Sequence, residues 1–121
     1  TALVATMVLL FVLLHCDVAH AKTWIVGDEF GWDMVIDEEV WPQGKTFYAG
    51  DVLVFNYDYQ RSNVVAVNRT GYITCTANEG ATTYNSGADH IPLGHGQHYF
   101  IDTYYEPSCA AGMKIAIFAK A

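Results

Sequence analysis

Residues 47–58, which read FYAGDVLVFNYD, contain the pattern that decides the fold. Gly50 and Asp51 signal a turn, and the run that follows over residues 52–57 is rich in β-branched and aromatic side chains. Similar short runs recur at residues 23–26, 63–68, 97–102 and 113–119, separated by clusters of Gly, Asn and Asp. Residues 33–40 and 78–85 are compatible with helical turns. We therefore expect an all-β domain, a single antiparallel sandwich of two sheets with short helical turns.

The composition limits the classes of protein to which the chain can belong. Its 121 residues suit one domain of ordinary size. Six Lys and Arg against 13 Asp and Glu give a net charge of −7, which argues against nucleic acid or an anionic membrane surface as partner. The hydrophobic fraction of 52% is too high for a disordered chain.

The N-terminal segment has the pattern of a secretory leader. Residues 2–14 form an apolar run, and Ala19-His20-Ala21 supplies a small-x-small cleavage site. The run is shorter than the ~20 residues of a membrane span; a buried core helix is the alternative. We expect a signal peptide over residues 1–21, truncated at its N-terminus because the basic start is missing, and a secreted domain over residues 22–121. A lipid-anchor signal is not visible, so we expect no stable membrane insertion.

Two cysteines remain in the domain after the leader is removed. Cys75 and Cys109 are an even count behind a secretion signal, which predicts one disulfide. Asn68-Arg69-Thr70 is an acceptor sequon and predicts N-glycosylation of Asn68 at a surface turn.

The residues do not indicate a catalytic site. Ser86 lacks the Gly-x-Ser-x-Gly context of a hydrolase nucleophile, and a free Cys does not remain in the domain. The run Asp37-Glu38-Glu39 is typical of a solvated face. His90, His95 and His98 are close enough in sequence to suggest zinc, but their segment looks like a loop, so we interpret them as exposed loop histidines.

A set of motifs spread over residues 22–121 carries a resemblance to one family. The motifs are residues 24–28 with Gly31-Trp32, then residues 41–45, 47–57, 63–68, 84–87, 99–101 and 109–116. Together they resemble the phytocyanins, the plant blue-copper proteins, and among them most of all the plantacyanins, or basic blue proteins. The resemblance implies a Greek-key, cupredoxin-like β-sandwich and a disulfide between Cys75 and Cys109.

The positions that hold copper in this family have changed. A blue-copper site needs two imidazoles, one thiolate and a weak axial ligand, often Met. The resemblance puts Ser62 and Ser108 at the histidine positions and Asp102 at the cysteine position; only the axial Met113 is kept. The segment from Asp102 to Ser108 is also longer than its family counterpart. The resemblance therefore implies a domain without bound metal, as in early nodulin-like members, with Met113 as a core residue.

Three functions remain open. The first is a copper-free, non-enzymatic binding or signalling module at the cell wall, monomeric and without a cofactor. Its interaction pole for an unknown extracellular partner is Tyr59, Arg61, Tyr104 and Tyr105, on two loops that the family fold implies to be neighbours; the alternative is that these side chains cover a vacated pocket. The second is a small blue-copper electron carrier, with copper as cofactor, and the third is another metal site built on Asp102, Glu106 and a loop histidine.

Overall fold

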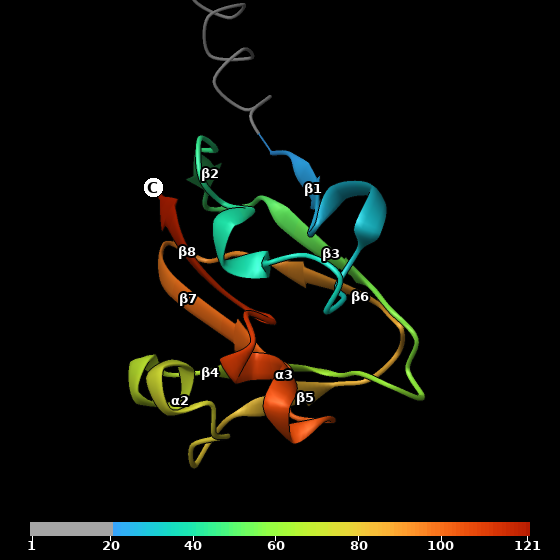
Figure 1. Cartoon of the computed structure of the whole chain (residues 1–121). Helices are drawn as coiled ribbons and strands as arrows, with labels where there is room; N and C mark the ends of the chain where they lie inside the picture. The colour runs from blue at the N-terminus through green and yellow to red at the C-terminus, as the bar shows by residue number, and fades with distance from the viewer. Residues whose placement is uncertain (1–20) are drawn as a thin grey trace, which may run out of the picture.

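Two β-sheets form the domain. The computed structural model describes residues 21–121, so the predicted signal peptide lies outside the described residues except for Ala21. Figure 1 shows the strands with short helical segments at the edges of the sheets. None of the helices among residues 21–121 is both long enough and apolar enough to cross a membrane.

The smaller sheet has the strand order β1-β3-β6, with β1 at Thr23–Ile25, β3 at Val52–Asn56 and β6 at Ala88–Pro92. β1 runs parallel to β3, and β6 runs antiparallel to it. The buried carboxylate of Asp51 fixes the turn before β3, because it accepts hydrogen bonds from the backbone N–H groups of Lys22 (2.9 Å) and Tyr48 (3.0 Å). It also accepts one from the Trp24 indole (3.0 Å), so Asp51 ties the start of the domain to this turn.

The larger sheet has the strand order β2-β8-β7-β4-β5. Its strands are β2 (Phe47–Tyr48), β4 (Val64–Val67), β5 (Thr82–Tyr84), β7 (Gly96–Ile101) and β8 (Lys114–Lys120). β2 and β8 are parallel, whereas the other neighbouring pairs are antiparallel. The chain crosses from one sheet to the other at each connection from β1 to β4, and again between β5 and β6 and between β6 and β7, which gives the sandwich its connectivity.

The core lies between the sheets. Leu53 and Phe55 alternate inward along β3 and belong to the same buried cluster as Phe100 and Ile115 of the larger sheet. The Phe55 ring lies 5.2 Å from that of Phe100, a distance at which aromatic pairs attract. A second cluster of Val65, Ile101 and Cys109 covers the other face of the larger sheet.

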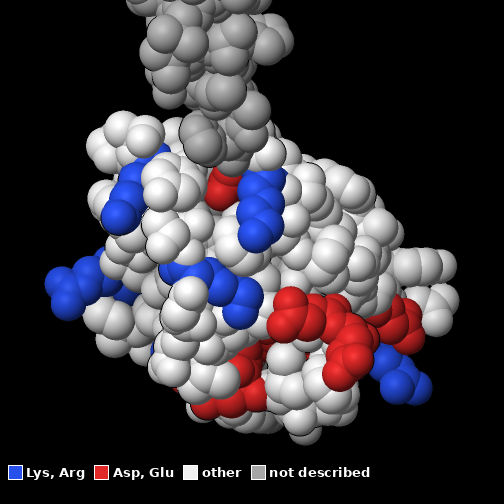
Figure 2. Space-filling view, turned by 90° about the horizontal axis from the view of Figure 1, so that it is seen from above, with Lys and Arg blue, Asp and Glu red and all other residues white. Residues whose placement is uncertain are grey.

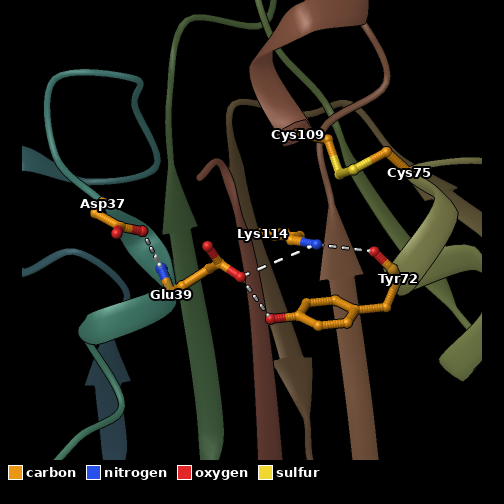
Figure 3. Close-up of polar contacts among 6 residues, drawn as sticks. All are labelled: Asp37, Glu39, Tyr72, Cys75, Cys109 and Lys114. Atoms are coloured by element: carbon orange, nitrogen blue, oxygen red, sulfur yellow. Dashed lines mark hydrogen bonds and ion pairs between the residues drawn. A yellow bond between two sulfur atoms is a disulfide. The ribbon is translucent and has the colours of Figure 1, made fainter. Parts of the chain in front are cut away.

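The disulfide Cys75–Cys109 joins two short helices, α2 (Arg69–Thr74) and α3 (Glu106–Ala110), over this second cluster. The predicted pairing is therefore confirmed. Figure 3 shows the contacts beside it: the Tyr72 hydroxyl donates to Glu39 Oε1 (3.2 Å), and Lys114 Nζ lies 3.9 Å from the same oxygen. Burial, with the nearby charge of Glu39, raises the pKa of Tyr72 to about 12. These contacts attach the turn around Glu39 to α2 and β8.

The prediction of an antiparallel sandwich is correct for most strand pairs and wrong for β1–β3 and β2–β8. β1 and β2 are short edge strands that pair with distant parts of the chain, and local sequence patterns do not encode such long-range pairing.

The predicted helical turns are partly wrong. Residues 33–40 contain the 3-10 turn η2 (Glu38–Val40), and another, η1 (Asp28–Phe30), precedes it. Residues 78–85 end instead in β5, because Thr82–Tyr84 pair with β4. Helix α2 was not predicted; it begins where Asn68 Oδ1 accepts a hydrogen bond from the N–H of Gly71 (2.8 Å).

Candidate functional site

Four chain segments bring the expected ligand positions together at one end of the sandwich. Ser62 lies in the loop before β4, Asp102 directly follows β7, Ser108 is in α3, and Met113 directly precedes β8. Asp102 is 1% exposed, and Ser108 and Met113 are also buried, whereas Ser62 is half-buried. Asp102 and Met113 are joined by a backbone hydrogen bond from the N–H of Asp102 to the carbonyl of Met113 (3.2 Å).

The Asp102 carboxylate is the centre of a hydrogen-bond network. Its Oδ1 accepts from the backbone N–H of Asn63 (2.9 Å), and its Oδ2 accepts from the backbone N–H of Tyr105 (3.3 Å) and from the Ser108 hydroxyl. The Ser108 Oγ also lies 2.7 Å from the carbonyl oxygen of Tyr105. One side chain thus links the loop before β4, the end of β7 and the start of α3.

These residues do not fit a blue-copper centre. The carboxylate oxygens are already used by three donors, the Ser108 hydroxyl is a poor metal ligand, and imidazole and thiolate donors are missing from the four positions. Met113 supplies a thioether, but it is a member of the main core cluster. Within residues 21–121, no group of three or more His, Cys, Asp and Glu side chains is placed to hold a metal ion.

The three histidines of the domain lie on different elements. His90 is in β6 and His98 is in β7, so the prediction that both lie in a loop is wrong; His95 does lie in the loop between those strands. Their segment pairs with β3 and β8, a partnership that its Pro and Gly residues concealed. His98 Nε2 is hydrogen-bonded to the carbonyl of Gly94 (2.8 Å).

A surface hollow of about 410 Å³ lies beside the Asp102 network. Its lining residues are Asp33, Met34, Gln60, Arg61, Ser62, Tyr104 and Tyr105. Three of the four predicted pole residues, Arg61, Tyr104 and Tyr105, thus surround one hollow. Tyr59 is exposed but does not line it; its side chain lies beside Gly87. The Asp102 carboxylate accepts from the backbone N–H of Tyr105, which lines the hollow, and from that of Asn63, which directly follows the lining residue Ser62.

Arg61 and the tyrosines are available for contact with another molecule. The Arg61 guanidinium makes one ion pair in the described part of the chain, with Asp58 at 3.7 Å, and both side chains are largely exposed. Tyr104 and Tyr105 are each more than half exposed. Exposed tyrosines and arginine around a hollow are typical of binding surfaces.

The prediction that residues 37–39 form a solvated face is wrong for Glu38, which is 0% exposed. Its Oε1 accepts a hydrogen bond from the N–H of Asp33 (3.2 Å), and its Oε2 has no partner in the described part of the chain. Burial is the main cause that raises the pKa of Glu38 to about 7; the charges of Asp33, Asp28 and Asp37 act in the same direction, and the hydrogen bond from the Asp33 N–H opposes them. Three adjacent carboxylates gave no sequence signal that the middle one turns inward.

Asn68, the predicted glycosylation site, is exposed at the start of α2. Its amide oxygen caps the helix, and its glycosylation remains a prediction.

The fold and the site define a cupredoxin-like domain in which protein hydrogen bonds occupy the metal position. A family profile described as Plastocyanin-like domain matches residues 32–113. The chain belongs to the phytocyanin family of plant proteins.

Relatives in sequence and structure agree with this assignment. Early nodulin-like protein 22 of Arabidopsis thaliana is 52% identical over 99% of this chain and 86% of its own length. Chemocyanin of Lilium longiflorum is 45% identical over 98% of this chain and 91% of its own. The solved structure of cucumber basic protein, a blue copper protein, superimposes with a TM-score of 0.75 at 46% identity, and covers 80% of this chain and 98% of its own.

Proposed function

We propose that the protein is a secreted, copper-free phytocyanin that acts as a non-enzymatic binding module outside the cell. The observation that carries the proposal is the Asp102 network. Where a copper-binding relative needs a thiolate, this chain has a buried carboxylate that already accepts three hydrogen bonds, from the loop before β4 and from the start of α3. The network holds together the same loops that a bound copper ion would hold together in a copper-binding relative.

The interaction surface in this proposal is the pole, in which Arg61, Tyr104 and Tyr105 line the hollow beside Asp102 and Tyr59 is exposed outside it. Binding sites need side chains that are exposed before binding and a backbone that is already ordered. Here the aromatic and guanidinium groups are exposed, and the Asp102 carboxylate holds the backbone of Tyr105 on one wall of the hollow. The pole therefore has a rigid base and accessible contact groups.

Metal analysis of the mature protein tests the proposal. The protein is purified from a secreting host, its N-terminus is sequenced, and its copper content is measured before and after incubation with one equivalent of Cu(II). We expect a start at Lys22, substoichiometric copper, and no intense blue band, because that band needs a thiolate-to-copper charge transfer and Cys75 and Cys109 are bridged. Uptake of one copper per chain with a blue colour would establish the electron carrier instead.

A further inference from the structure

A second hollow, of about 360 Å³, lies between η1 and η2, away from Asp102. We call it the acidic groove; one side is Gly27–Phe30, and the other contains Asp37, Val40 and Trp41. The groove has its own residues: none of those that line it also lines the hollow of the pole.

The chain segment that forms this groove carries concentrated negative charge. Six of the twelve carboxylates of residues 22–121 lie between residues 28 and 39, and residues 23–44 contain no Lys or Arg. Figure 2 shows acidic side chains gathered in the lower part of the view, whereas most Lys and Arg side chains lie toward the upper left. Among the described residues, the ion pairs use Asp58 and Glu39, so Asp28 and Glu29 have no cationic partner there.

Apolar side chains at the groove are exposed to solvent. Phe30 is 54% exposed and Val40 is 50% exposed. Trp41 forms part of the wall, and Lys45, the one cation of the lining, is already engaged: its Nζ donates to the carbonyl of Trp41 (2.8 Å) and lies 4.9 Å from the ring centroid. Exposed apolar groups rimmed by charge are typical of an interaction surface.

The η2 turn also holds polar groups without partners. The two buried side-chain atoms that lack a hydrogen bond among the described residues are Glu38 Oε2 and the Trp41 indole nitrogen. Trp41 is more than nine-tenths buried and lines the groove. Because the indole nitrogen itself is shielded from solvent, a bound peptide would contact the exposed part of Trp41 in the groove wall, and the indole N–H resonance would report that contact.

We propose that the acidic groove docks a basic, partly apolar peptide segment of a partner protein. Lysine or arginine side chains of the segment pair with Asp28 and Glu29, and an aliphatic side chain packs against Phe30 and Val40. Charge complementarity selects this occupant, because the −7 charge of the chain repels acidic segments and anionic membranes. The inference is independent of the proposed function at the pole.

Indole NMR signals of the mature, disulfide-bonded protein provide the test. The three tryptophans give three indole N–H resonances, and those of Trp24 and Trp32 are internal controls because they already donate to Asp51 and to the Asn63 carbonyl. The probes are the capped hexapeptides of alternating Leu-Lys, Gly-Lys and Leu-Glu. Trp41→Phe identifies the third resonance.

We expect the Leu-Lys peptide to shift the Trp41 resonance and leave the other two in place, the Gly-Lys peptide to bind more weakly, and the Leu-Glu peptide not to bind. The double variant Asp28→Asn with Glu29→Gln should weaken binding about fivefold. Asn is suited to position 28, whose φ is 53°. The control, Glu79→Gln with Glu106→Gln, removes the same charge from exposed sites outside the groove and should not change binding.

With added peptide, any of three results would overturn the proposal: no saturable shift of the Trp41 resonance, equal weakening by both double variants, or equal binding of the Leu-Glu peptide. A Trp41 shift that depends on protein concentration without peptide would show that a second copy of this chain fills the groove, which also overturns it.

Discussion

Replacement of Asp102 is the perturbation that most directly tests the network. Asp102→Ala removes the acceptor of the Asn63 and Tyr105 N–H groups and of the Ser108 hydroxyl. A hydrogen bond to a charged acceptor contributes about 1.5–3 kcal/mol. The Tyr105 contact is long, and Ser108 can turn to the Tyr105 carbonyl at 2.7 Å, so the main loss is the Asn63 bond. We expect a cost of about 3–4 kcal/mol in the free energy of unfolding, including the small cavity.

Asp102→Asn separates acceptor chemistry from volume. Asn keeps an oxygen for the Asn63 N–H but puts an NH₂ group toward the Tyr105 N–H, so we expect a cost of about 1–2 kcal/mol. Exposed Asp58→Ala is the control and should change stability by less than about 0.5 kcal/mol.

The measurement is urea unfolding of the disulfide-bonded variants, followed by tryptophan fluorescence, with slope and midpoint both fitted. If Asp102→Ala unfolds at the midpoint of Asp58→Ala, the carboxylate does not hold the loops together and the reasoning fails. If Asp102→Asn costs as much as Asp102→Ala, the loss reflects charge rather than the acceptor at Asn63.

Three further predictions follow from the same contacts. The folded-state pKa of Glu38 is about 7, above its ordinary 4.5, so its contribution to stability is complete below pH 4.5 and is lost as pH rises through 7, a decrease of about 3 kcal/mol. The urea midpoint of the wild type should therefore fall between pH 4.5 and 8, and that of Glu38→Gln should change less with pH. An equal dependence of the midpoint on pH in both proteins would contradict this. Cys75→Ala should cost roughly 2–5 kcal/mol in thermal or urea unfolding, since it opens the link between α2 and α3; two titratable thiols in the folded wild type would remove the basis for this. The triple variant Ser62→His, Asp102→Cys and Ser108→His should gain copper affinity and a blue band, because Met113 and the sandwich are in place. Recovery should be incomplete because position 108 is held within α3. A colourless variant with wild-type copper content would show that the scaffold no longer accommodates the ion.

The sequence alone determined the class of fold and the chemistry at the ligand positions. Alternating apolar residues in runs such as 52–57 bury one face of a strand, a property of neighbouring residues that is readable without a structure. The loss of copper ligands is likewise a matter of residue identity, since Ser62, Asp102 and Ser108 lack imidazole and thiolate groups in any conformation. The bridge between Cys75 and Cys109 followed from their count and from family resemblance.

Only the tertiary structure decided which polar groups are buried and which strands pair across the chain. Asp102 and Asn63 are 39 positions apart, so the bond between them exists only after β4 and β7 pair. Glu38 is surrounded by carboxylates in sequence and is nevertheless buried, because η2 turns it inward beneath Gly27 and Asp33. The sequence did not predict that β1 pairs in parallel with β3, that β2 pairs in parallel with β8, or that His90 and His98 lie in strands. The reason is the same in each case: long-range contacts, rather than local preference, set the strand partners of these residues.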